Sequence, residues 1–361
     1  MNHVIIIPTL NPTIKLVSFV KLLLEKCASN VIIVNDGSNN ECRVIFETLS
    51  GLDNCDVITM DKKCGKGIAL KTAFLYYLEH YSEMDGVVTV QDDAKYSIND
   101  IKKVIDVLNR KEEKLVLGIR NLLDDTNSFY SKYGIRITNI IFKFLYGSDI
   151  KDTLTSLRGI PTNILRDMLH LKGDSSEYEM NMLVHATKQK IIIEQVPTNT
   201  VLDKMYQSSY RLNFTDYFRI ILKLMSGFFH YLVSFGLSGL IDIVCFVLLY
   251  HFVFDDLSLQ ANIFISALLS RTLSSICNFI MNRNVVFSNS NHLVQSLIKY
   301  YILWFGLLVS SSFFVYGISA YLPVNVAILK VIIDLLLGIA SYQIQLLWVF
   351  KNKKDKFKLH Q

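Results

Sequence analysis

The stretch DGVVTVQDDAKYS, residues 85–97, decides the fold of the first part of the chain. Residues 87–90 are β-forming and too few for a helix, so they predict a buried strand. Alternation along this strand places Gln91 and Asp93 on one face and Asp92 on the other. Ligands of open α/β sheets bind at the carboxyl ends of the strands, and adjacent acids there suit a divalent cation that holds a diphosphate. The alternative is a strand that runs into an acidic turn without a ligand.

The sequence on both sides of this stretch alternates between strand and helix patterns. Strands are expected at residues 3–8, 31–35, 56–60, 114–119 and 191–196, and helices at residues 12–27, 65–80, 98–109, 130–145 and 177–188. This alternation predicts a Rossmann-like α/β domain with a mainly parallel sheet and helices on both faces.

The composition narrows the class of protein. The chain has 361 residues, a net charge of +5 and 51% hydrophobic residues. No basic run with interleaved aromatic residues indicates a nucleic-acid partner. The six cysteines lack metal-ligand spacing, and the apolar residues 4–7 are too few for a signal peptide. We therefore expect the α/β part to lie in a reducing, cytosolic environment.

The last third of the chain is apolar enough to enter a membrane. Residues 214–225, FTDYFRIILKLM, have the pattern of an amphipathic helix at a bilayer surface. Four apolar stretches of membrane-spanning length follow, at residues 228–254, 257–280, 300–322 and 324–350. The placement of Lys and Arg puts both termini in the cytoplasm. The ends of the second and fourth stretches, NRNVVF and QLLWVF, suggest two related helix pairs.

Four charged residues lie in or near these stretches, namely Asp242, Arg271, Lys330 and Asp334. Charges inside a bilayer are costly and are usually paired or functional. Lys330 and Asp334 are four residues apart on one helix and can pair with each other. Pairing is the preferred interpretation, with a transport role as the alternative.

Nine short motifs occur in one order along the first part of the chain: IIPTLNP (6–12), VNDGS (34–38), GKGIAL (65–70), TVQDDAKY (89–96), LGIR (117–120), SKYG (131–134), DTLTSLRGI (152–160), EYEMNML (177–183) and SSYRLNFTD (208–216). Through them, residues 1–220 resemble the family 2 glycosyltransferases of the GT-A fold, and among these the polyprenyl-phosphate sugar synthases of the dolichyl-phosphate mannose synthase type. Residues 228–350 resemble the GtrA-like four-span membrane domain, through FGLSGLID (235–242) and NFIMNRNVVF (278–287).

The resemblance implies a domain plan and a reaction. The plan is a GT-A domain at residues 1–203, interfacial helices at 204–227, a four-span domain at 228–350 and a basic cytoplasmic tail at 351–361. The reaction is the inverting transfer of one sugar from a UDP- or GDP-linked donor to polyprenyl phosphate, with undecaprenyl phosphate expected, at the cytoplasmic face of the cell membrane for cell-envelope glycosylation. The alternative is a lipid-linked sugar translocase or scaffold whose transferase domain is catalytically degenerate. The sugar, the lipid length and a homo-oligomeric state stay open.

The same resemblance implies the site residues. The nucleotide sugar is expected to contact Pro8, Asn11, Asp36, Lys66, Gln91 and Asp92. The lipid phosphate is expected at Arg120, Lys132 and Arg211, and Asp152 is the expected catalytic base or acceptor-orienting carboxylate. Each has a simpler alternative: Asp36 and Asp152 as turn residues, the glycines around Lys66 as a helix entry, and the cations as surface charges.

The expected cofactor is Mg²⁺ or Mn²⁺, bound by Asp93 and Gln91. Here the sequence departs from the family pattern, because Gln91 replaces the first aspartate of an Asp-x-Asp pair and Lys95 replaces a glutamine. Pro12 replaces a glutamate, and Lys132 replaces an arginine. An amide oxygen is a poorer ligand for a hard cation than a carboxylate, so we expect weakened metal binding.

Overall fold

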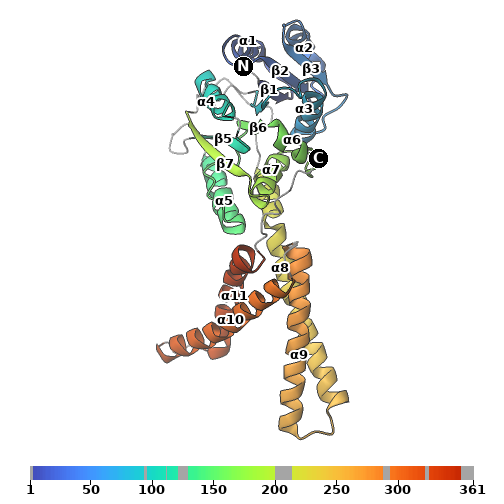
Figure 1. Ribbon diagram of the computed structural model, residues 1–361, viewed down its shortest axis with the longest axis vertical. Coiled ribbons are helices and arrows are strands. Elements are labelled where there is room, and N and C mark those ends of the chain that lie inside the picture. The colour runs from blue at the N-terminus through green and yellow to red at the C-terminus, as the bar shows by residue number, and fades with distance from the viewer. Residues whose placement is uncertain are drawn as a thin grey trace. The chain divides into compact units, whose positions relative to one another are not determined.

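The computed structural model describes residues 3–92, 96–110, 112–120, 129–199, 214–287, 293–321 and 325–350. The chain divides into two compact units, residues 1–223 and residues 224–361. The described part of the first unit is α/β, and that of the second unit is helical (Figure 1).

The strands described in the first unit form one seven-stranded sheet in the order β3-β2-β1-β4-β6-β5-β7 (Figure 1). Their bounds are β1 (His3–Thr9), β2 (Asn30–Asn35), β3 (Cys55–Thr59), β4 (Gly86–Thr89), β5 (Lys114–Arg120), β6 (Arg158–Pro161) and β7 (Ile192–Thr198). Neighbouring strands pair in parallel, except that β6 is antiparallel to β4 and β5. The expected Rossmann-like, mainly parallel α/β domain is confirmed.

Helices cover both faces of this sheet. They are α1 (Lys15–Lys26), α2 (Arg43–Ser50), α3 (Lys66–His80), α4 (Ile98–Leu108), α5 (Phe129–Tyr146), α6 (Thr162–Leu169) and α7 (Glu177–Lys188). Because side chains alternate along a strand, Ile5 and Ile7 of β1 share one core with α1, α2 and α4. Val4 and Ile6 are fully buried on the opposite face, where α3 packs on β1.

The order of the strands fixes where a ligand can bind. From β1 the chain proceeds outward through β2 and β3, and then returns to place β4 on the other side of β1. The carboxyl ends of β1 and β4 therefore meet at a topological switch point, where connections leave in opposite directions. Open α/β sheets bind ligands in the crevice at such a point.

The second unit is built from four long helices in its described part (Figure 1). They are α8 (Phe214–Leu248), which begins in the first unit, α9 (Leu259–Met281), α10 (Leu293–Tyr321) and α11 (Val326–Ile344). Three of them end in a π-helical turn, at Leu249–Val253, Asn282–Val286 and Gln345–Val349. All four are long and apolar enough to cross a membrane, as the hydropathy pattern predicts.

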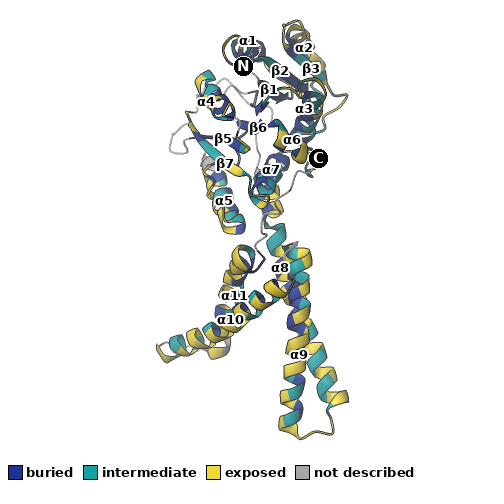
Figure 2. Ribbon diagram, viewed as in Figure 1, coloured by how far each residue is buried: buried dark blue, intermediate teal, exposed yellow. Residues whose placement is uncertain are grey.

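The surface of the second unit is apolar. Figure 2 shows these helices as largely exposed or intermediate, whereas the central strands of the first unit are buried. Large apolar side chains such as Phe264 (69% exposed) and Phe313 (69% exposed) are mostly exposed. An exposed apolar surface of this extent suits contact with lipid.

The two helix pairs of the second unit, α8 with α9 and α10 with α11, end in equivalent residues that contact each other. Asn282 and Gln345, 63 residues apart, each begin a π-helical turn, and their side-chain amides hydrogen-bond to each other at 3.0 Å. Phe287 and Phe350 close the same two turns and stack, with ring centroids 5.1 Å apart. These equivalences agree with the repeat suggested by NRNVVF and QLLWVF.

The structure also differs from the expectations. α8 runs without a break from Phe214 to Leu248, so the expected surface helix and the first membrane-length stretch form one helix. Its glycines are tolerated inside a helix and it contains no proline to end it. Three elements were not predicted, namely α2, β6 and α6. They are only four to eight residues long, too short for a clear periodicity.

Candidate functional site

The carboxyl edge of the sheet gathers the expected site residues of the first unit. β1 ends at Thr9, β2 at Asn35, β4 at Thr89 and β5 at Arg120, and the antiparallel β6 begins at the same edge. Pro8, Asn11, Asp36, Gln91, Asp92, Arg120 and Asp152 all lie in or just beyond these strand ends, within one unit.

Asp92 and Gln91 are both anchored at the switch point. The Thr9 hydroxyl at the end of β1 donates to Asp92 Oδ2 at 2.6 Å, and Asp92 is buried. The Ser156 hydroxyl donates to Gln91 Oε1 at 3.2 Å. Asp92 therefore ties β4 to β1, and Gln91 ties β4 to the segment before β6. Thr9 and Ser156 were not predicted as partners, because both contacts join residues far apart in the sequence.

Asp36 holds the loop that precedes α3. Its carboxylate is fully buried and accepts hydrogen bonds from the backbone N–H of Cys64 (2.6 Å) and of Gly65 (3.0 Å). Gly65 has φ +106°, and a Cβ atom there would lie 2.4 Å from the Asp174 carbonyl oxygen. Only glycine fits this close approach. Asp36 therefore fixes the position of the GKG segment, and its contact with a donor stays a prediction.

Asn11 links the ends of β1 and β2. It adopts a left-handed backbone conformation with φ +51°. Its N–H donates to the Ser38 hydroxyl and its Oδ1 accepts from the Asn39 N–H, both at 2.8 Å. Pro8, buried in β1, lies opposite Val34 of β2. Pro8 and Asn11, both expected to contact the nucleotide sugar, thus lie at the same corner of the sheet.

Lys66 has a buried partner that the sequence did not predict. Its ammonium lies 2.7 Å from Glu179 Oε2 on α7, and the two side chains are only 5% and 11% exposed. Most of its charge is already neutralised by this pair. The GKG segment therefore begins helix α3 and is attached to α7 through this ion pair, in agreement with the alternative that these glycines mark a helix entry. Contact of Lys66 with the donor phosphate stays a prediction.

Arg120 and Asp152 form one unit at the carboxyl edge of the sheet. Arg120 Nε donates to Asp152 Oδ2 at 2.7 Å and Nη2 donates to Oδ1 at 2.9 Å. Asp152 is fully buried and also accepts from the Leu154 N–H at 3.2 Å. Burial alone would lower the pKa of Arg120, but the Asp152 carboxylate outweighs it and raises that pKa above its ordinary value. Two residues assigned to different roles by sequence are thus a single charge pair.

Arg158 supports the loop that carries Asp152. It is 1% exposed and donates from Nε to the Thr155 carbonyl at 2.9 Å and from Nη1 to the Glu179 carbonyl. Burial lowers the pKa of Arg158. The guanidinium therefore ties the segment before β6 to α7, which also carries the partner of Lys66.

Several expected residues fall outside the described part of the chain. Asp93, Lys95 and Arg211 are not described, nor is the side chain of Lys132. Among the residues that are described, no group of three or more His, Cys, Asp or Glu side chains could hold a metal ion. Gln91 and Asp92 fit a cation only if the donor's phosphate oxygens supply further ligands, which is how Mg²⁺ commonly binds in nucleotide sites.

Comparison with known proteins finds similarities that lie in the first unit. Residues 4–169 match the model of glycosyl transferase family 2. The chain is 26% identical over 196 residues to glycosyltransferase AglJ of Haloferax volcanii, a match that covers 54% of this chain and 61% of AglJ. It thus spans less than two thirds of that relative's length.

Similar solved structures include glucosyl-3-phosphoglycerate synthase from Mycobacterium tuberculosis in complex with Mn²⁺, UDP and glucosyl-3-phosphoglycerate. The TM-score is 0.48 at 15% identity, over 62% of this chain and 79% of that one. The same enzyme with Mn²⁺, UDP-glucose and phosphoglyceric acid gives 0.47 at 14% identity over 62% and 79%.

Proposed function

We propose that this chain transfers one sugar from a nucleotide-sugar donor to polyprenyl phosphate, with undecaprenyl phosphate as the lipid. The match of residues 4–169 to the model of glycosyl transferase family 2 supports this proposal. The observation that carries the proposal is the convergence of Asp36, Gln91, Asp92 and the Arg120–Asp152 pair on the carboxyl edge of the sheet.

The donor is a UDP- or GDP-linked sugar bound at the switch point between β1 and β4. Pro8, Asn11 and Asp36 would border its nucleoside, and Gln91 and Asp92 its diphosphate. Support comes from the anchoring of these residues, because a site held by packed strands and hydrogen bonds loses little entropy when a ligand binds.

The proposed acceptor is a lipid phosphate. Because the lipid lies in a membrane, the chain has to work at the membrane surface. The same chain carries a transferase domain and four helices of membrane-spanning length. We place the transferase domain and both termini in the cytoplasm, because Lys and Arg gather at the corresponding helix ends. Arg120, Lys132 and Arg211 are the proposed contacts of the acceptor phosphate.

The chemistry needs positioning more than proton transfer. A phosphate oxygen of the acceptor forms the bond to the anomeric carbon, while the bond to the donor diphosphate breaks and the nucleoside diphosphate leaves with the electron pair. The acceptor oxygen is already anionic near neutral pH, so no base is needed to create the nucleophile. Asp152, held by two hydrogen bonds from Arg120, would orient the acceptor and keep Arg120 in place.

A divalent cation, Mg²⁺ or Mn²⁺, would neutralise charge on the leaving diphosphate. Asp93 and Gln91 are the proposed ligands. Because Gln91 brings no charge, the cation would bind together with the donor and more weakly than at a pair of aspartates.

The test is a transfer assay on the purified full chain with a panel of UDP- and GDP-sugars. Undecaprenyl phosphate is compared with undecaprenol, which lacks the phosphate, and with 3-phosphoglycerate, which lacks the lipid. We expect labelled sugar to enter the organic phase only with undecaprenyl phosphate, and EDTA to abolish the transfer. Transfer to 3-phosphoglycerate, or equal transfer to undecaprenol, would contradict the acceptor. Donor binding without any transfer would support the alternative, a translocase or scaffold with a degenerate transferase domain.

A further inference from the structure

Helix α5 of the first unit has two apolar faces. Ile135, Phe142 and Leu145 are buried inside the unit. Four other large side chains of the helix are 38% to 68% exposed, namely Tyr133, Ile137, Ile140 and Phe144. Residues three and four apart lie above one another on a helix, so these four form one stripe on the side away from the buried residues. We call this stripe the outward face of α5.

A continuous apolar stripe has a different meaning from single exposed apolar residues. Ile14, Val44 and Leu75 of the first unit are exposed too, but they lie on separate helices or just before one, and isolated exposures of this kind are common. Contiguous apolar surface on a folded domain usually marks contact with a membrane or with another protein. The outward face of α5 therefore needs an occupant.

The charges beside the stripe indicate the chemistry of that occupant. The sequence of α5, FYSKYGIRITNIIFKFLY, contains three cations and no Asp or Glu. Arg136 lies four residues before Ile140 and Lys143 three residues after it, so both cations border the stripe. Lys143 also lies 3.1 Å from Asp149, in an exposed pair of a kind that contributes little. Cations beside an apolar stripe match the phosphates and acyl chains of an anionic bilayer surface.

α5 is attached to a helix of membrane-spanning length. A Cβ atom on Gly134 would lie 2.6 Å from the Tyr217 ring, so the start of α8 packs closely on α5. The same helix continues to Leu248 and is apolar enough to cross a membrane. Its first turns also expose Phe218 and Leu222. Insertion of α8 therefore tethers α5 to the bilayer, and tethering strengthens a contact that would be weak alone.

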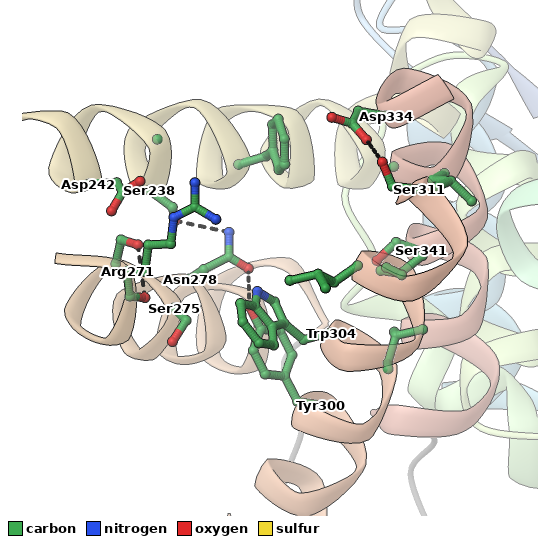
Figure 3. Close-up of a pocket in the computed structure, with 18 of the residues that line it drawn as sticks. Ser238, Asp242, Arg271, Ser275, Asn278, Tyr300, Trp304, Ser311, Asp334 and Ser341 are labelled. Atoms are coloured by element: carbon green, nitrogen blue, oxygen red, sulfur yellow. Dashed lines mark hydrogen bonds between the residues drawn. The ribbon is translucent and has the colours of Figure 1, made fainter. Parts of the chain in front are cut away.

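The helices of the second unit separate apolar and polar side chains in another way. Their large apolar side chains lie outward (Figure 2), whereas polar side chains gather between the helices (Figure 3). Tyr300 donates to Asn278 Oδ1 and Asn278 Nδ2 donates to the Ser238 hydroxyl, both at 2.9 Å. Lys330 and Asp334 pair at 3.0 Å, as the sequence predicts. The outward face of α5 instead keeps cations exposed beside its stripe, which suits the headgroup region rather than the bilayer interior.

We propose that the outward face of α5 lies on an anionic bilayer surface, with its apolar stripe reaching the acyl chains and with Arg136 and Lys143 at the lipid phosphates. This contact is additional to the insertion of α8. It goes beyond the proposed sugar transfer, which requires a membrane but no contact of α5 with it.

The contact has a consequence for the segment that carries Asp152. Asn139 of α5 accepts from the Thr153 N–H at 3.0 Å and donates to the Lys151 carbonyl. Both chain neighbours of Asp152 are thus held by α5, so docking of the helix would fix this segment near the lipid headgroups. The use of that placement for a lipid acceptor rests on the proposed function, whereas the membrane contact itself does not.

Fluorescence quenching in nanodiscs tests the contact in the full chain. Ile140→Cys is introduced into a chain without its own cysteines and labelled with bimane, and the nanodisc lipids carry nitroxides on their acyl chains. Val44→Cys is the matched control, because Val44 is 66% exposed and Ile140 68% exposed. In nanodiscs of phosphatidylcholine and phosphatidylglycerol, we expect strong quenching at position 140 and little at position 44.

Two kinds of variant separate the charges from the stripe. Each cation near an anionic surface changes the docking equilibrium about fivefold, so Arg136→Gln with Lys143→Gln should weaken docking about 25-fold and lower the quenching at position 140. Omitting phosphatidylglycerol should have the same effect. Ile137→Asp should also lower it, because the change places a carboxylate in the stripe. Lys21→Gln, at an exposed position of α1, should change nothing.

Three results would overturn the proposal. The first is equal quenching at positions 140 and 44, and the second is quenching that neither Ile137→Asp nor the double charge variant changes. The third is disulfide cross-linking of position 140 between two chains without quenching, which would assign the face to a second copy. No sugar is transferred in these measurements, so an inactive chain can still show the contact and an active one can still lack it.

Discussion

Arg120 holds the carboxylate of Asp152 with two parallel hydrogen bonds, Nε to Oδ2 at 2.7 Å and Nη2 to Oδ1 at 2.9 Å. Arg120 ends β5, and Asp152 lies in the segment that leads into β6. The pair therefore couples the end of one strand to the start of its antiparallel neighbour. Its carboxylate is fully buried and its guanidinium side chain is 13% exposed.

We expect Arg120→Gln to destabilise the first unit strongly. Removing one partner leaves a buried charge without compensation, which costs about 3–5 kcal/mol. The measurement is thermal unfolding of the detergent-solubilised chain. Arg136→Gln, on an exposed face of α5, is the control and should change the melting temperature little. If the two variants melt at the same temperature, the Arg120–Asp152 pair does not stabilise the fold.

The Lys66–Glu179 pair should behave differently when both partners are removed. Lys66→Met or Glu179→Met alone leaves one buried charge and should lower the melting temperature clearly. The double variant should be more stable than either single one, because apolar groups of similar size can replace a buried ion pair. Lys21→Met, at an exposed position of α1, is the control. Additive losses in the double variant would show that the two residues act independently.

Gly65→Ala should disrupt the loop before α3. The residue has φ +106°, and a Cβ would lie 2.4 Å from the Asp174 carbonyl oxygen. Backbone strain alone costs about 1–3 kcal/mol, and the clash displaces the N–H groups that bind Asp36. We expect weaker nucleotide binding by calorimetry and a lower melting temperature. Gly51→Ala is the matched control, because the nearest atom to its Cβ would lie 3.6 Å away. If the Gly65→Ala and Gly51→Ala variants bind nucleotide equally well, the loop before α3 does not belong to the donor site.

Cysteine labelling reports on the same loop. Cys64 is partly exposed, and its N–H binds Asp36. Burial raises the pKa of Cys55 to about 12 and of Cys27 to about 11, so their reactive thiolates are scarce at pH 8. We expect iodoacetamide to modify Cys64 before these two residues, and a UDP- or GDP-sugar to slow it. Labelling of Cys64 that no nucleotide slows would place the donor elsewhere.

The raised pKa values of Cys27 and Cys55 also predict how the stability of the fold changes at alkaline pH. Above about pH 9 the thiols ionise in the unfolded chain but not in the folded one, so unfolding releases protons. The contribution of Cys27 and Cys55 to stability is therefore complete below pH 9 and is lost as the pH rises toward 11 and 12. The double variant Cys27→Ala and Cys55→Ala should melt with a weaker pH dependence above pH 9 than the parent chain. An identical pH dependence would contradict this assignment.

The topology can be tested with single cysteines introduced into a chain without its own. A membrane-impermeant maleimide added to intact cells should label Asp256→Cys, between α8 and α9, and not Lys354→Cys, in the basic tail. The reason is the bias of Lys and Arg toward the cytoplasm. Labelling of position 354 but not of position 256 would invert the proposed orientation.

Much of the fold could be predicted from local patterns. The strand before Gln91 is a short apolar run bounded by polar residues, and such runs identify a buried strand without tertiary information. β6 escaped prediction because Arg158 and Gly159 interrupt any β pattern. Arg158 is buried there only because the carbonyl groups of Thr155 and Glu179 receive its donors, and that arrangement exists only in the folded chain.

The site could be predicted in its position but not in its pairings. Asp36 and Asp92 follow strands, so their arrival at one edge of the sheet was predictable, whereas Asp152 precedes β6, a strand that the sequence did not predict. Lys66 pairs with Glu179 across 113 residues of sequence, and a local glycine pattern contains no information on such a partner. The same holds for Arg120 and Asp152, which sequence reasoning assigned to two separate tasks.

The most direct test of the central claim is mass spectrometry of the lipids formed when the purified full chain is incubated with undecaprenyl phosphate and a panel of UDP- and GDP-sugars. We predict one product, undecaprenyl phosphate carrying a single sugar, and its near-complete loss in Asp152→Asn while nucleotide binding is retained. The absence of any such lipid, with donor still bound by the native chain, would contradict the account and leave the first unit as a transferase domain without transfer.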